Sequence, residues 1–283
     1  MKLSLYIFSF FIFLFTNTSL AQSNDFEAAG YSIGIGTVFT TVGAIINKDK
    51  EEKVWDVIKK RWWQGAVGGY LQFESKRILR EVDSHDQWPL FWSSKIVNEM
   101  GSSIQHNAAY NQPFGRYWYF NIAFNRIEID TKDRWQLKYK LRPIDFLFTT
   151  DAAIRYNFEF QESLRYGHPV FTTGDSNLNG QRAYASAGYL VRERNENSIS
   201  LIKHEFVHVL QNNEYSILNT YYQPFLDIRK DKNKFYKWLN SNLYIEAHYI
   251  PLRGLYLLET WTAENYTDNF FEMEADYFSG FRR

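Results

Sequence analysis

The chain has 283 residues, of which 45% are hydrophobic and 23% charged, so it is long enough for a sizeable core and is not broadly disordered. Its 32 basic and 32 acidic side chains cancel, which argues against a protein that binds nucleic acid by charge. It has no cysteine, which excludes disulfides, thiol catalysis and thiolate metal sites. Any metal ion must therefore be held by His, Asp or Glu.

The first 21 residues have the layout of a secretory signal. Lys2 provides a positive start, Leu3 to Phe15 is an apolar run, and Ser19-Leu20-Ala21 ends the segment with small residues. The alternative is a retained anchor helix, but the apolar run is short for one. Cleavage after Ala21 would leave 262 residues with a net charge of −1, because Lys2 is the only charged residue removed. We expect an exported protein that is periplasmic, held in the outer envelope or secreted.

The next segment, Gly30 to Ile46, is uncharged and contains four glycines. Small residues allow close helix packing, either in a membrane or inside a globular fold. The segment is marginal in length and composition for a membrane span, so we favour a packed helix or strand. Val54 to Leu79 is expected to be helical in pieces, and Phe91 to Asn107 to be helical.

The middle of the chain changes character between Tyr117 and Tyr156. Alternation of apolar and polar residues with a period of two runs along 119–126, 127–130 and 135–141, which indicates half-buried strands. Residues 130–133 (DTKD) are the expected turn before the last of them. Arg182 to Arg192 is a candidate for one more strand. The aromatic share of 19% fits a β-rich part, or a surface that meets membrane or sugar.

These segments predict an α+β fold in which a single domain spans residues 22–283. Residues 22–115 are expected to be mainly helical, residues 116–195 to be β-rich with antiparallel strands, and residues 196–283 to be helical and to carry a metal site. Neither a Ser/Pro-rich linker nor a repeat divides the chain.

An HExxH motif, HEFVH, occupies residues 204–208 inside a stretch of helical patterning, Ser198 to Gln211. His204 and His208 are one helical turn apart, so both imidazoles project from one face, as two ligands of one metal ion must. Glu205 lies roughly 100° around the helix and can reach a metal-activated water without being a ligand. We predict that Glu205 is the catalytic base. The alternative is a helix with two surface histidines.

A catalytic zinc ion needs a third protein ligand, and Glu272 in EMEAD near the C-terminus is the first candidate. Asp276, one turn later, would accept the free N–H of a ligating histidine, preferably His204. Asp268 or Asn269 is expected to cap this helix, and Gly280 to end it. The alternative role of Glu272 is to complete a capping box with Asn269. The weaker candidates for the third ligand are Glu274, Glu259 and Glu264.

HEFVH followed much later by EMEAD resembles the gluzincin metallopeptidases, in which HExxH on one helix meets the glutamate of ExxxD on a later helix. The resemblance covers about Ser198 to Gly280. It implies one Zn²⁺ ion with Glu205 as the general base and Asp276 as support behind a ligand. The ligands that it implies are His204, His208 and Glu272.

We therefore expect an exported zinc metallopeptidase of the cell envelope that hydrolyses a peptide or protein substrate. The candidate oxyanion donors are His248 and Tyr277, with Tyr244 as a further one. His85, His106 and His168 are expected to be structural or at the surface. One alternative is a non-catalytic envelope protein that binds a partner through its aromatic β-rich middle, with a zinc site that only clamps two helices. Association with a membrane surface through residues 30–46 is compatible with either function.

Overall fold

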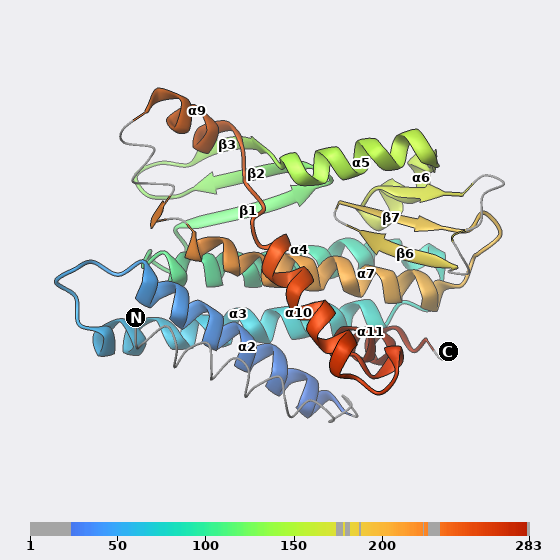
Figure 1. Cartoon of the computed structure of the whole chain (residues 1–283), viewed down its shortest axis with the longest axis horizontal. Helices are drawn as coiled ribbons and strands as arrows, with labels where there is room; N and C mark the ends of the chain where they lie inside the picture. The colour runs from blue at the N-terminus through green and yellow to red at the C-terminus, as the bar shows by residue number, and fades with distance from the viewer. Residues whose placement is uncertain are drawn as a thin grey trace.

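The computed structural model describes residues 24–173, 178, 182–186, 188–222, 224–225 and 233–281. The predicted signal, residues 1–21, lies outside this range. As the sequence predicted, the fold is α+β, with helices at both ends and strands in the middle. In Figure 1 the long helices α2, α3, α4 and α7 run beneath the strands, and α10 and α11 cross in front of them.

The N-terminal helices form one layer. α2 (Asp25–Ile46) packs along α3 (Val54–Arg80), and α3 packs along α4 (Trp88–Ala109), which follows the short η1 (His85–Gln87). α3 is one continuous helix rather than the expected pieces. Its glycines do not interrupt it, because they lie on the faces that contact α2 and α4.

Glycine brings the backbones of these helices into direct contact. A Cβ atom on Gly65 would lie 2.9 Å from the carbonyl oxygen of Gly36, and one on Gly101 would lie 2.6 Å from that of Gly68. No side chain fits at such distances. Among the described residues, α2 alone is long and apolar enough to span a membrane by length and composition. Gly36 of α2 nevertheless packs against α3, and Gly43 packs against α4 and the later segment around Thr220, which agrees with the globular interpretation of residues 30–46.

The first sheet is antiparallel, and its strands are β1 (Tyr117–Ile122), β2 (Asn125–Asp130) and β3 (Gln136–Leu141). The predicted alternation along 119–126 runs through a tight turn. Ala123 adopts a left-handed conformation in this turn, with φ 50°. Among the described non-glycine residues, Asn111 is the other one with a positive φ, at 56°. The Asn125 amide donates to the Ile122 carbonyl at 3.0 Å and closes the turn. Because the turn contains no glycine, the sequence did not mark it.

This sheet has its polar face inside. Arg126 is 4% exposed, whereas Leu137 and Tyr139 on the opposite face are 75% and 56% exposed. A one-sided sheet ordinarily buries its apolar face. The reversal has a local cause, because the inner face borders a cavity that is described below.

The second sheet has the strand order β4-β5-β7-β6, with β5 and β7 parallel, so the strands in the middle of the chain are not all antiparallel. The predicted strand over 182–192 is a hairpin, β6–β7, in which Gly188 has φ 78°. β6 ends the sheet and packs on α7. The elements of this part are α5 (Pro143–Arg155), β4 (Asn157–Phe158), α6 (Phe160–Tyr166), β5 (Val170–Thr172), β6 (Ala183–Ser186) and β7 (Tyr189–Arg192).

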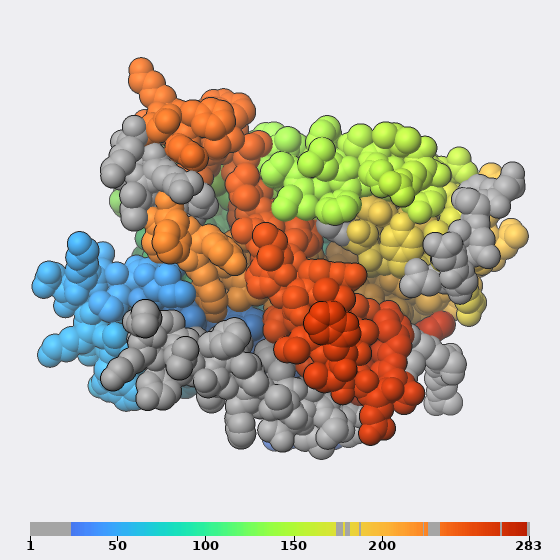
Figure 2. All heavy atoms as spheres, viewed as in Figure 1, coloured from blue at the N-terminus to red at the C-terminus, as the bar shows by residue number. Residues whose placement is uncertain are grey.

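The C-terminal part is helical. In Figure 2 its orange-to-red atoms run across the visible face, from α9 at the upper left to α11 at the lower right. Asn269 caps α11 by accepting the Phe271 N–H at 2.9 Å, and Gly280 ends it in a left-handed conformation, as the sequence predicted. The elements are α7 (Ile199–Glu214), η2 (Tyr215–Tyr221), α9 (Lys234–Asn242), α10 (Tyr249–Thr262), η3 (Tyr266–Asp268) and α11 (Phe270–Ser279).

Candidate metal centre

The contact between α7 and α11 brings the three predicted ligands together. His204 Nε2 lies 3.2 Å from His208 Nε2 and 3.3 Å from Glu272 Oε2. His208 Nε2 lies 3.6 Å from Glu272 Oε1. Two atoms bound to one ion at about 2.1 Å with a tetrahedral angle stand about 3.4 Å apart. The three separations therefore fit ligands of a single ion.

The core behind the two helices fixes this geometry. Phe206 of α7 and Ala275 and Phe278 of α11 are fully buried in one apolar cluster. Because these residues face inward on both helices, the neighbouring face of α7 presents His204 and His208 to α11. The metal centre thus follows from two amphipathic helices whose apolar stripes pack together.

Asp276 supports His204 from behind. Its Oδ1 lies 2.9 Å from His204 Nδ1, on the side of the ring away from Glu272. This contact fixes the orientation of the imidazole and leaves Nε2 directed at the cluster. Burial would lower the pKa of His204, but the hydrogen bonds with Asp276 and Glu272 raise it.

Gln211 plays the corresponding part for His208. Its Oε1 lies 2.8 Å from His208 Nδ1, and its amide donates to Glu274 Oε2 at 2.9 Å. Burial would lower the pKa of His208, but the hydrogen bond and charge of Glu272 raise it to about 9. Burial would also raise the pKa of Glu272, yet the two imidazoles hold it far below its usual range. The Glu272 carboxylate is therefore stabilised by positive charge beside it, either a proton on an imidazole or a bound cation.

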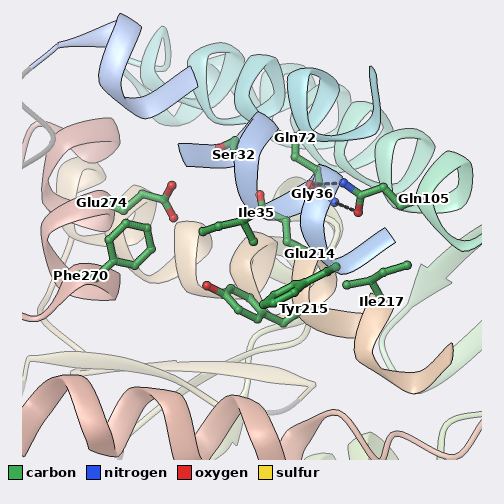
Figure 3. A pocket seen from close by; sticks show the side chains of 11 residues that line it. Ser32, Ile35, Gly36, Gln72, Gln105, Glu214, Tyr215, Ile217, Phe270 and Glu274 are labelled. Carbon is green, nitrogen blue, oxygen red and sulfur yellow. Dashed lines mark hydrogen bonds between the residues drawn. The ribbon is translucent and has the colours of Figure 1, made fainter. Parts of the chain in front are cut away.

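Glu274, a weaker ligand candidate, belongs to a buried ionic network behind the site. Lys76 is 1% exposed, and its Nζ lies 2.7 Å from Glu274 and 2.9 Å from Glu214. Figure 3 shows both carboxylates beside a small cavity of about 20 Å³, with the doubly hydrogen-bonded amides of Gln72 and Gln105 at its far end. This network holds Gln211, and through it His208.

Two tyrosines that the sequence did not indicate complete the surroundings of Glu272. The hydroxyls of Tyr256 in α10 and Tyr266 in η3 each donate to Glu272 Oε1 at 2.8 Å. The chain has 20 tyrosines, and no spacing distinguishes these two. Gln211 did have a signal, because it follows His208 by three residues and so shares its helix face.

Glu205, the predicted general base, lies beside the ligands between α7 and β6. It is 6% exposed, and its carboxylate accepts the backbone N–H of Ala185. Burial raises its pKa, partly offset by the positive charge of His208 and His204. A carboxylate with a raised pKa is a better proton acceptor near neutral pH.

The structure places neither His248 nor Tyr277 at the cluster. Tyr277 follows Asp276 directly, so the helix turns it by roughly 100° toward α2 and α3. Its hydroxyl donates to Asp25 at 2.6 Å and lies 3.2 Å from an Arg80 nitrogen. Its hydroxyl therefore lies too far from the cluster to donate to a substrate carbonyl there.

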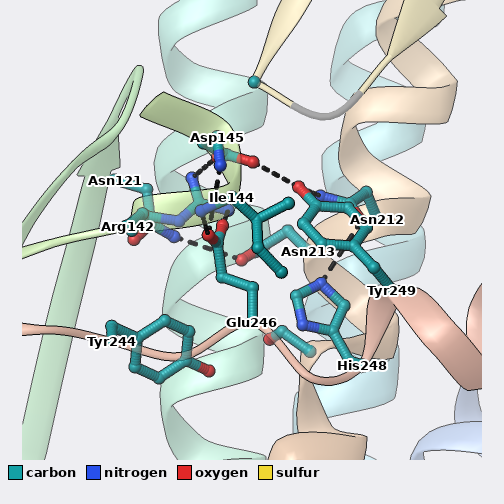
Figure 4. A network of polar contacts seen from close by, with 12 residues as sticks. Asn121, Arg142, Ile144, Asp145, Asn212, Asn213, Tyr244, Glu246, His248 and Tyr249 are labelled. Atoms are coloured by element: carbon teal, nitrogen blue, oxygen red, sulfur yellow. Dashed lines mark hydrogen bonds and ion pairs between the residues drawn. The ribbon is translucent and has the colours of Figure 1, made fainter. Parts of the chain in front are cut away.

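His248 lies in a separate buried network, drawn in Figure 4. One ring nitrogen lies 3.3 Å from Asn212 Oδ1, and burial lowers its pKa well below the usual value, so the ring is neutral. In the same network Arg142 pairs with Glu246 at 2.9 Å and with Asp145. These contacts join the start of α5 to the segment before α10, so His248 has a structural role. The remaining histidines, His85, His106 and His168, lie outside the metal cluster.

Comparisons of the chain with protein-family models, curated proteins and solved structures gave no match. The case for a metal centre therefore depends on the geometry of its own residues.

Proposed function

We propose that this protein is an exported zinc-dependent metallopeptidase in which His204, His208 and Glu272 hold one Zn²⁺ ion. The observation that carries the proposal is the set of ligand separations, 3.2, 3.3 and 3.6 Å. Two imidazoles and one carboxylate suit zinc better than magnesium or calcium, which prefer oxygen ligands. The resemblance to the gluzincins implies the same ligand set. Export is inferred from the layout of residues 1–21, which is that of a secretory signal.

When bound, the ion would lower the pKa of a water molecule and polarise a carbonyl group. Glu205 would accept the proton of the attacking water and pass it to the leaving amine. Its burial beside the ligands supports this role, because a buried carboxylate binds a proton more readily than an exposed one. Asp276 would keep the His204 ring oriented throughout.

The edge strand β6 supports a peptide as the substrate. The Arg182 carbonyl accepts the Glu193 N–H at 2.8 Å, so in antiparallel alternation the backbone polar groups of Ala183 and Ala185 point away from β7. The Ala185 N–H reaches Glu205, so this edge borders the metal centre. An extended peptide that added to the edge would bring its carbonyl groups close to the base.

The burial of the ligands favours a second function, a zinc ion that only clamps two helices. The side chains of His204 and Glu272 are each 3% exposed. A closed structural site takes four protein ligands, however, and the cluster in the described part of the chain offers three. The three-ligand set therefore supports catalysis over clamping.

The zinc content and peptidase activity of the chain from Gln22 onward test the proposal. We expect one zinc ion per chain and hydrolysis of casein, an unfolded protein substrate. His204→Ala should lose both, whereas His85→Ala, which removes a histidine outside the cluster, should keep both. Full zinc content in His204→Ala would refute the ligand assignment. Zinc binding without hydrolysis in the unaltered chain would favour the clamp.

A further inference from the structure

A second polar site lies apart from the metal centre. A cavity of about 840 Å³, open on one side, is lined by residues of the first sheet, the end of α4, η2 and α9. None of the residues that line it belongs to the metal cluster. Cavities of this size accommodate small organic molecules.

Arg126 of β2 is the central residue of the cavity wall. It is 4% exposed, and its guanidinium carbon lies 3.6 Å from the centre of the Tyr119 ring and 3.9 Å from that of Tyr244. Its Nε donates to Glu128 at 2.7 Å. Within the described chain its two terminal Nη nitrogens make no hydrogen bond, although they border the cavity. These donors are therefore open to water or to a ligand that carries oxygen acceptors.

A second donor on the wall also lacks an acceptor. The side-chain nitrogen of Asn240 in α9 is buried and has no hydrogen-bond partner among the described residues. The Asn240 side chain lines the cavity, but this nitrogen has almost no exposed surface, so it reaches a ligand only after the side chain rotates. A ligand rich in oxygen acceptors would satisfy both this amide and the Arg126 guanidinium.

The charges on the wall are positive in sum. Lys138 and Lys140 of β3 line the cavity with Arg126, and Glu128 is the acidic residue among the lining side chains. Lys140 lies 3.1 Å from Glu128, so that pair is neutral together. His106 adds no charge, because burial and nearby Arg126 lower its pKa to about 3. The surplus of positive charge favours an anion.

We propose that this cavity binds a small organic anion, a sugar acid or sugar phosphate, whose carboxylate or phosphate group lies against the Nη groups of Arg126. The planar guanidinium suits such groups because it donates two parallel hydrogen bonds. The Tyr119 and Tyr244 rings keep that plane fixed, and Asn240 donates to a further oxygen. Aromatic side chains on the wall, among them Tyr117 and Trp118, suit contact with the face of a sugar ring.

Binding of an anion in this cavity would explain why the first sheet has its polar face inside. Arg126 pairs with Lys140 across the strands, and Glu128 pairs with Lys138, so one face of β2 and β3 carries a row of charges. That face borders the cavity, while apolar residues such as Leu137 remain exposed. Departures from ordinary burial are expected at functional sites, where ligand binding and not stability selects the residue.

Calorimetric titration of the zinc-loaded chain tests the proposal without any need for hydrolysis. The probes are glucuronate, glucose 6-phosphate, inorganic phosphate and glucose. We expect saturable binding of at least one anionic sugar, weaker binding of inorganic phosphate, and none of glucose. Arg126→Gln should weaken the binding at least tenfold, with circular dichroism used to verify its fold.

A pair of variants in α9 keeps the test independent of Arg126. Asn240→Asp places a carboxylate on the wall and should weaken binding at least tenfold. Asn242→Asp makes the same charge change at an exposed residue that does not line the cavity, and it should bind as the unaltered chain does. The proposal is overturned if no anionic sugar binds, or if Asn240→Asp and Arg126→Gln both bind within twofold of the unaltered chain. Equal affinity for inorganic phosphate and glucose 6-phosphate would overturn the assignment of a sugar.

Discussion

The metal centre and the cavity are both buried polar sites, but the atoms that converge in them are opposite in kind. In the metal centre, two imidazole nitrogens and a carboxylate lie within 3.2 to 3.6 Å of one another. In the cavity, the basic side chains of Arg126, Lys138 and Lys140 line one shared space. Converging lone pairs call for a cation, and converging N–H groups call for an anion. The charge of a missing ligand can therefore be inferred from which kind of group is in excess.

The largest expected effect separates the base from the ligands of the metal centre. Glu205→Gln should lower kcat/KM for casein by about 10²–10⁴-fold, because a general base contributes about that factor. Zinc content should not change, since Glu205 is not a ligand. Glu81→Gln, the same change at an exposed residue of the N-terminal helical layer, is the control. Activity within tenfold of the unaltered chain would show that Glu205 is not the base.

The second prediction concerns pH, because a proton on His208 and a zinc ion compete for the same ring nitrogen. Burial would lower the pKa of His208, but Glu272 raises it from 6.5 to about 9 in the zinc-free protein. The protonated ring therefore stabilises the zinc-free fold below pH 6.5, by a free energy on the order of 3 kcal/mol, and this contribution is lost as the pH rises through 9. Zinc requires the neutral ring, so its affinity should rise over the same range.

Urea unfolding of zinc-free and zinc-loaded protein at pH 6, 7.5 and 9 measures this exchange. The free energies of unfolding of the two forms should diverge as the pH rises. His208→Gln should remove most of the divergence. Parallel curves for the two forms of the unaltered chain would contradict the assignment of His208 as a ligand.

The third prediction concerns the support behind a ligand. Asp276→Asn removes the charge 2.9 Å from His204 Nδ1 and should weaken zinc binding about 10- to 100-fold without abolishing it. Competition with a zinc chelator gives the affinity. Asp133→Asn, in the exposed turn before β3, should leave the affinity unchanged. A change of less than threefold for Asp276→Asn would mean that packing alone orients His204.

The smallest expected effect lies at the rim of the cavity. Lys138 is 43% exposed and lies 3.4 Å from Asp130, so its charge is screened by solvent and by a partner. Lys138→Gln should weaken binding of the preferred anionic sugar only about two- to threefold and make it less dependent on salt. Lys132→Gln, outside the cavity lining, is the matched control. A loss greater than tenfold for Lys138→Gln would make Lys138, and not Arg126, the main contact.

The sequence predicted which residues converge at the candidate metal centre, because they occur in pairs that are local in sequence. His204 and His208, like Glu272 and Asp276, are each one turn apart, so forming the helix is enough to place them on one face. Tyr256 and Tyr266 could not be predicted, because their approach to Glu272 depends on how α10 and η3 pack against α11. Tyr277 was a candidate only through its place beside Asp276, and helical rotation turns it elsewhere.

The sequence predicted the strands of the first sheet but not the cavity. Alternation marks the two faces of a strand, yet which face is buried depends on what packs against it. Arg126 acquires its environment from Tyr244, which comes from a segment remote in sequence. The left-handed turn at Ala123 was likewise invisible, since no glycine accompanies it.

The glycine contacts of α2, α3 and α4 bear on which part of the molecule can move when a ligand binds. At Gly65 and Gly101 the helix backbones touch directly, with no side chain between them that could adjust. α7 packs against α3, α4 and α11. The helix that carries His204 and His208 is therefore held firmly by its neighbours. The opposite side of the site is more exposed, since Trp261 of α10 and Tyr266 of η3 are 77% and 48% exposed. If the proposed zinc ion acts on a polypeptide, the corner formed by α10 and η3 is the part that we expect to move aside, and the hydroxyl groups of Tyr256 and Tyr266 would then move away from Glu272.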